Sequence, residues 1–119
     1  MSNRMTEAEE KLADIIWSRE PVLSRDLVNI CEEAFGWKKS TTYTMLKRLE
    51  SKNIFKNDCG SVISTIKKED YQAQQGCSFI DTEFNGSLPA FISAFTKKRK
   101  LTKDDIQSLR KMIEDFEEE

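Results

Sequence analysis

The chain has 119 residues, of which 38% are hydrophobic and 34% charged, and its formal net charge is −2. This length predicts one small domain, or a small domain with an oligomerisation arm. Two prolines and four glycines favour a mostly helical chain. The sequence contains no histidine, which excludes Ser-His-Asp and Cys-His catalysis, and no phosphate-binding glycine motif. We therefore expect no enzyme, no cofactor and no metal.

Hydropathy and cysteine usage predict a cytoplasmic protein. No stretch approaches the roughly 20 apolar residues of a membrane span, so no membrane insertion is expected. The first thirty residues carry six acidic groups and no long apolar run, unlike a signal peptide. Cys31, Cys59 and Cys77 are isolated and odd in number, as is typical of a reducing compartment.

Charge is concentrated in the centre of the chain. Residues 36–68 contain eight basic and two acidic side chains, whereas residues 1–35 contain four basic and eight acidic ones. Residues 69–119 are again acidic, with seven basic and eleven acidic side chains. A basic centre between acidic flanks indicates a polyanionic partner. A solvated helix face is the alternative.

The first two predicted helices are marked by their ends. Thr6 and Glu9 form a capping-box pattern at the start of a helix that ends near Ser18, ahead of a proline. The following PVL stretch predicts a short strand. Ser24 is expected to cap a second, amphipathic helix, and Gly36 to end it.

A third helix is predicted over residues 40–52, with two distinct faces. Helical spacing places Thr42, Met45, Leu46 and Leu49 on the core side. The opposite side carries hydroxyl groups and cations, which suit phosphates and base edges in a DNA major groove. Arg48 could instead form an internal ion pair, and Tyr43 could be a packing ring. With a lysine from the hairpin that follows, the predicted DNA-binding residues are Lys39, Ser40, Thr41, Tyr43, Thr44, Lys47, Arg48 and Lys56.

Two strands are predicted next, over residues 54–56 and 62–66, around a turn containing residues 57–60. Two helices, a basic helix and a hairpin follow one another in the order of a winged helix-turn-helix. The alternative for the hairpin is a ribbon that only covers the core. We expect a winged-helix DNA-binding domain over residues 1–68.

Residues 69–119 predict further helices. One ends at Asn85-Gly86, a second holds Pro89 in its first turn, and a third begins after Thr102. In the last helix, four apolar residues spaced three, four and three apart form a two-heptad seam: Ile106, Leu109, Ile113 and Phe116. The seam is too short for an isolated helix, so it either folds back on its own chain or pairs with a second subunit.

Three segments together resemble those of a known family. Its first helix, which ends in an Ile-Trp pair, is similar to residues 6–17 (TEAEEKLADIIW). Its recognition helix resembles residues 36–55, with the Trp37 lead-in and the TMLxRL core. Its dimerisation segment is similar to residues 78–95 (SFIDTEFNGSLPAFISAF). The family is the penicillinase-repressor group of bacterial transcription factors (BlaI/MecI/CopY).

The resemblance implies a homodimeric repressor that binds an inverted-repeat operator on double-stranded DNA. Residues 69–119 would hold the dimer, through Phe79, Phe84, Leu88, Phe91 and the seam. In β-lactam-responsive members a sensor protease cleaves before a phenylalanine; the matching bond is Ala94-Phe95, where those repressors have Asn before the Phe. The Cys-x-Cys pairs of copper-responsive members are missing from the C-terminal end, and so is the wing tyrosine from residues 62–66.

The sequence is also compatible with a second function, which belongs to a different class of protein. A winged-helix protein-interaction module without strong DNA binding is compatible with the net acidic chain. Titration with duplex DNA at two salt concentrations separates the two functions, because only phosphate binding releases counterions.

Overall fold

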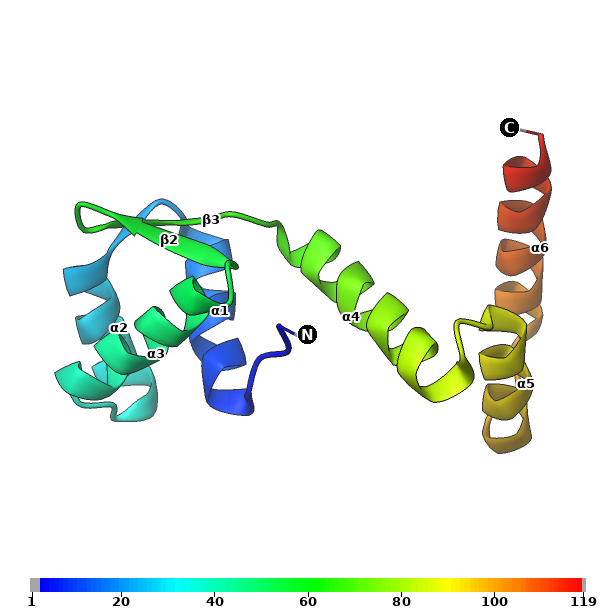
Figure 1. The fold of residues 1–119 in the computed structure, drawn as a ribbon, viewed down its shortest axis with the longest axis horizontal. Helices are drawn as coiled ribbons and strands as arrows, with labels where there is room; N and C mark the ends of the chain where they lie inside the picture. The colour runs from blue at the N-terminus through cyan, green and yellow to red at the C-terminus, as the bar shows by residue number, and fades with distance from the viewer. Residues whose placement is uncertain (1–2, 119) are drawn as a thin grey trace. The chain divides into compact units, whose positions relative to one another are not determined.

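The computed structural model describes residues 3–118, which form a mostly helical chain with one small antiparallel sheet (Figure 1). This confirms the predicted fold class of a winged helix-turn-helix followed by a helical region. The elements within the described range are α1 (Glu7–Arg19), β1 (Val22–Leu23), α2 (Ser24–Phe35), α3 (Lys39–Ser51), β2 (Phe55–Asp58), β3 (Ser61–Ser64), α4 (Lys68–Phe84), α5 (Leu88–Lys98) and α6 (Lys103–Glu117).

Contacts divide the chain into two compact units, Met1–Ser78 and Phe79–Glu119. The division falls inside α4, whose first eleven residues therefore belong to the first unit. The predicted boundary between the DNA-binding domain and the dimerisation region, after residue 68, lies at the first residue of α4. This boundary stays a prediction.

The sheet has the order β1-β3-β2, with both neighbours antiparallel. The predicted strand at PVL is confirmed, since Val22 pairs with Val62. The hairpin differs from the expected one: β2 continues to Asp58, and only Cys59 and Gly60 form the turn. Both turn residues have positive φ, 52° and 91°, as a tight two-residue hairpin loop requires.

The core of the first unit lies between α1, α2, α3 and the sheet. Phe55 at the start of β2 is fully buried, and its ring centroid lies 5.1 Å from that of Trp17. The Trp17 indole N–H donates to the Ile66 carbonyl at 3.1 Å, which ties α1 to the end of the hairpin. The other buried apolar residues are Met5, Leu12, Ala13, Ile16, Leu27, Cys31, Leu46, Leu49, Ile54, Val62 and Tyr71.

Two predicted helix starts are corrected. The Thr6 hydroxyl accepts from the Glu9 N–H, but the Glu9 carboxylate binds Lys52 instead of completing the capping box. Ser24 does not cap α2: it is the first helical residue, after Leu23, and no side chain caps this helix start in the described chain. The Ser24 N–H, which has no partner inside the helix, donates to the Gly60 carbonyl at 2.8 Å. The hairpin therefore supplies the partner of one N–H group at this helix start. Gly36 ends α2 in the left-handed conformation, as predicted.

In the second unit the predicted helix ends are confirmed. Asn85 and Gly86 both have positive φ after α4. The Ser87 hydroxyl caps α5, with Pro89 in its first turn, and Thr102 forms a complete capping box with Asp105 at the start of α6. α5 continues to Lys98, so Lys97 and Lys98 lie in its last turn.

Candidate nucleic-acid interface

The turn between α2 and α3 holds the two helices in a fixed arrangement. After the left-handed Gly36, the N–H groups of Gly36 and Trp37 donate to the carbonyls of Glu32 (2.9 Å) and Cys31 (3.4 Å). The rings of Phe35 and Trp37 contact each other at a centroid distance of 5.1 Å. Backbone and rings together stabilise this corner, so α3 is presented by a rigid helix-turn-helix.

The start of α3 is suited to an anion. Within residues 3–118, no side chain caps its first N–H groups, and its N-cap is Lys38. Its first turn contains Lys39 and no acidic residue. Unpaired N–H groups at the positive end of a helix, next to cations, are typical of phosphate contacts.

The faces of α3 lie as predicted. Thr42, Leu46 and Leu49 are buried and Met45 is half-buried on the core side. Thr41 and Tyr43 are partly covered at the flanks, which leaves the packing role of Tyr43 open. The exposed side carries Lys39, Ser40, Thr44, Lys47, Arg48 and Ser51. This surface combines three cations with three hydroxyl groups and faces solvent.

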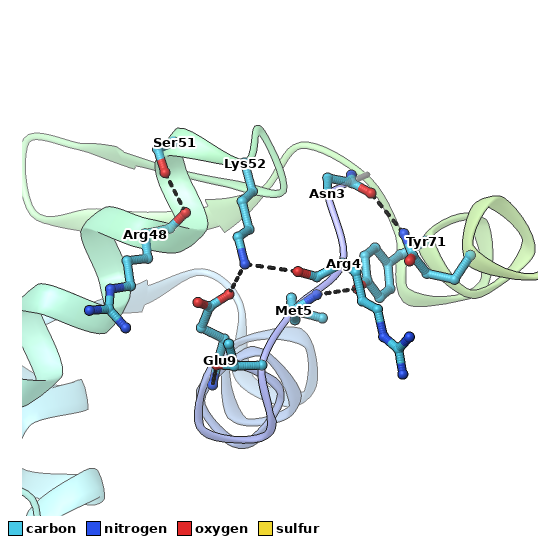
Figure 2. A network of polar contacts seen from close by, with 10 residues as sticks. Asn3, Arg4, Met5, Glu9, Arg48, Ser51, Lys52 and Tyr71 are labelled. Carbon is cyan, nitrogen blue, oxygen red and sulfur yellow. Dashed lines mark hydrogen bonds and ion pairs between the residues drawn. The ribbon is translucent and has the colours of Figure 1, made fainter. Parts of the chain in front are cut away.

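Arg48 takes part in no ion pair of the described chain, where the two pairs are Lys52–Glu9 and Lys68–Asp14. Figure 2 shows its side chain pointing away from the neighbouring Lys52–Glu9 pair. The guanidinium is therefore exposed and available to an external anion.

The hairpin presents fewer cations than α3. Lys56 is exposed on β2, but the exposed tip carries Asp58 and Cys59. At the base, Lys68 is paired with Asp14 at 2.9 Å. The tip is fixed, because the Gly60 carbonyl accepts from the Ser24 N–H and the Gly60 N–H donates to the Asn57 side chain at 2.9 Å. Two exposed lysines outside these ion pairs, Lys56 on β2 and Lys67 at the base, remain for a wing contact.

One ion pair that positions α3 was not predicted. The ammonium of Lys52, which follows the last residue of α3, binds the Glu9 carboxylate of α1 and donates to the Arg4 carbonyl at 2.9 Å (Figure 2). Glu9 is only 2% exposed. The pair ties the end of α3 to α1, and no local pattern could reveal it, since the partners are 43 residues apart.

The predicted dimerisation residues lie in the second unit. Phe79, Phe84, Phe91 and Phe95 form a chain of ring contacts with centroid distances of 5.4 to 6.0 Å. Leu88 is exposed, and on α6 Ile113 and Phe116 are 60% and 77% exposed. Ile106 is also exposed, whereas Leu109 is half-buried. The α6 seam is thus an apolar face that the described chain leaves largely uncovered.

The predicted cleavage bond lies inside a helix. Ala94 and Phe95 are both half-buried residues of α5.

In residues 3–118, no three His, Cys, Asp or Glu side chains come together as a metal site. No helix in that range is long and apolar enough to cross a membrane. Burial raises the pKa of the Cys31 thiol, and the Thr42 hydroxyl partly offsets this, whereas Cys59 and Cys77 are exposed.

A helix-turn-helix whose exposed basic helix is followed by an antiparallel hairpin defines a winged helix-turn-helix protein, here with a C-terminal helical region. The chain belongs to the penicillinase repressor family, whose model matches residues 5–115. The resemblance seen in the sequence is therefore confirmed. The family is one of transcriptional repressors, which are not enzymes.

Curated relatives match over nearly the whole chain. The penicillinase repressor of Staphylococcus aureus is 25% identical to this chain, and the match covers 98% of each of the two chains. That of Bacillus licheniformis is 23% identical over 94% of this chain and 91% of its own. The methicillin resistance regulatory protein MecI of Staphylococcus aureus strain N315 is 21% identical over 92% of each chain.

Proposed function

We propose that this protein is a cytoplasmic repressor that binds an inverted-repeat operator as a homodimer. The exposed face of α3 enters the major groove, and Lys56 of the hairpin contacts the backbone. Binding excludes other proteins from the same DNA. Two-fold symmetry lets each subunit contact one half-site.

One observation carries this proposal: the solvent-facing side of α3 holds cations and hydroxyl groups only, although the chain as a whole is acidic. A helix that needed only solubility would carry charges of mixed sign on this side. Thr41 and Tyr43 at the edges add a methyl group and a ring that can contact base edges. The family relationship supports the same function.

Operator binding is tested by selecting duplexes from a random pool and titrating the selected sequence at two salt concentrations. We expect binding that weakens steeply with salt. We expect Lys47→Ala to weaken binding by about 1–3 kcal/mol if the lysine contacts a base, or to lower the log–log salt slope by about 1 if it contacts a phosphate.

Lys111→Ala is the matched control, because it removes the same charge from an exposed position of α6 and should leave both quantities unchanged. A folded wild type that binds no duplex at low salt would contradict the proposal and favour the protein-interaction module. An unchanged slope and affinity in Lys47→Ala would remove this residue from the interface.

We also propose that a sensor protease relieves repression by cleaving the Ala94–Phe95 bond. Cleavage there would detach residues 95–119, and with them the α6 seam, from the DNA-binding unit. Because the bond lies in a helix and the Phe95 ring packs on Phe91, α5 must open locally before a protease can bind an extended strand. Mass spectrometry of the protein from derepressed cells should show a fragment ending at Ala94; finding only intact chain contradicts this route.

A further inference from the structure

The residues ahead of α1 form a bridge between the winged helix and the start of α4. The Met5 N–H donates to the Tyr71 hydroxyl at 2.9 Å, and the Gln75 amide donates to the Asn3 side chain at 2.7 Å. Figure 2 shows the segment from Asn3 to Met5 running between Tyr71 on one side and Lys52 on the other. We call residues 3–5 together with Tyr71 and Gln75 the clasp.

The Met5–Tyr71 contact of the clasp is part of the core, whereas Asn3 and Gln75 are half-buried at its edge. Met5 and Tyr71 are each only 5% exposed. The Tyr71 ring lies 5.9 Å from Trp17, which in turn contacts Phe55 at the start of the hairpin. A buried N–H that lost its acceptor would be costly, so the Met5–Tyr71 bond is favoured whenever the segment is packed.

Two contacts on the same helix restrict its orientation more than one contact would. Tyr71 and Gln75 are four residues apart on α4, one turn and about 6 Å along the helix axis. A single bond would act as a pivot, whereas two bonds a turn apart restrict the tilt of the helix as well as its position. The Lys68–Asp14 ion pair adds a third, exposed tie to α1. All these residues belong to the first unit.

We propose that the clasp is a positioning device that fixes the direction in which α4 leaves the winged helix, and that it thereby determines which spacing of operator half-sites the dimer accepts. The inference rests on the proposed function. α4 is one helix of 17 residues that leads into the proposed dimerisation region. Half-sites that face the same side of the DNA are separated by whole helical turns of about 10 base pairs. Adding one base pair therefore shifts and rotates one half-site relative to the other. Only a dimer with a stiff connection between its DNA-binding units loses affinity for such an altered operator.

The first test uses the double variant Tyr71→Phe/Gln75→Ala, which removes both α4 partners of the segment while keeping the buried ring. Its affinity is measured for the selected operator, for operators with one or two base pairs added or removed between the half-sites, and for a single half-site. We expect affinity for the selected spacing to fall about tenfold, affinity for altered spacings to change little, and the single half-site to be unaffected.

The matched control is Gln74→Ala, which shortens an exposed glutamine of the same helix whose side chain makes no hydrogen bond in the described chain. It should keep the spacing preference of the wild type. A merely destabilised protein would lose affinity for every spacing and for the single half-site in proportion to its unfolded fraction. A folded double variant with the wild-type spacing preference overturns the inference.

A second measurement needs no DNA. Cys59 and Cys77 are exposed and lie in the same unit, whereas Cys31 is buried, so spin labels can be attached to the wing tip and to α4. Labelled chains are mixed with an excess of unlabelled Cys59→Ser/Cys77→Ser protein, so that distances within one chain dominate. We expect the distance distribution to be at least twice as wide in the double variant as in the wild type.

The two measurements separate the possible failures. An unchanged distance distribution in the double variant overturns the clasp, whatever the DNA results are. A wild type with a narrow distribution that binds no duplex overturns the proposed function and, with it, the role in half-site spacing.

Discussion

Replacing Phe55 with alanine should lower the free energy of unfolding by about 3–5 kcal/mol, the cost of removing a large ring from a packed core. Phe55 is 1% exposed and packs against Trp17 at the point where α3 leads into the hairpin. Because small domains are stable by only about 5–15 kcal/mol, this is a large fraction of the total. Urea unfolding at one fixed protein concentration measures it, since the stability of a dimer depends on concentration.

Phe55→Leu is the matched control. It keeps most of the buried volume and should cost less than about 1.5 kcal/mol. If alanine and leucine had equal effects, the ring would not fill the core as described. The position matters for function because Trp17 also contacts Tyr71, so a collapse at Phe55 should disturb the clasp as well.

The elements that the sequence predicted well are those marked by local chemistry. A left-handed glycine ends α2 at Gly36, and Asn85-Gly86 ends α4 in the same way. Thr102 caps α6 through its own hydroxyl group, as expected for a helix that begins after it. Each of these signals acts within four residues, so the chain around it is enough to determine the outcome.

The errors arose where a distant partner replaced the local one. Glu9 could have returned a bond to Thr6, but a buried carboxylate is stabilised more by the Lys52 ammonium than by a second cap contact. Ser24 was expected to cap α2 with its hydroxyl group, but the helix begins at Ser24 itself, whose N–H donates to the Gly60 carbonyl of the hairpin. Neither partner could be inferred from helical or strand periodicity.

The candidate site was predictable only in part. The outward face of α3 follows from its 3.6-residue period, and the exposed positions of Ser40, Thr44 and Lys47 agree with it. What holds that helix in place, and what fixes α4, was not predictable. The clasp joins residues 66 and 72 positions apart, and its members carry no motif of their own.

The largest functional effect is expected for Leu109→Asp. Leu109 lies at the centre of the α6 seam, between Ile106 and Ile113, and the described chain leaves most of this seam exposed, with Leu109 itself half-buried. A carboxylate there would have to be buried without a partner if two copies paired through this face, which is strongly unfavourable. We expect the variant to sediment as a monomer with an intact winged helix, and a full-size dimer would contradict the seam.

Loss of the dimer should also lower the affinity for the operator. When two half-sites are bound by linked subunits, the second contact occurs at a high effective concentration and strengthens overall binding by about 10²–10⁴. Leu109→Asp should lose a factor of this size on the full operator but keep wild-type affinity for a single half-site. Gln107→Asp, which adds the same charge on the opposite side of α6, should change neither quantity. Equal losses on full and half operators would instead mean that the substitution damages the DNA-binding unit, because dissociation of a dimer cannot weaken a contact that one subunit makes alone.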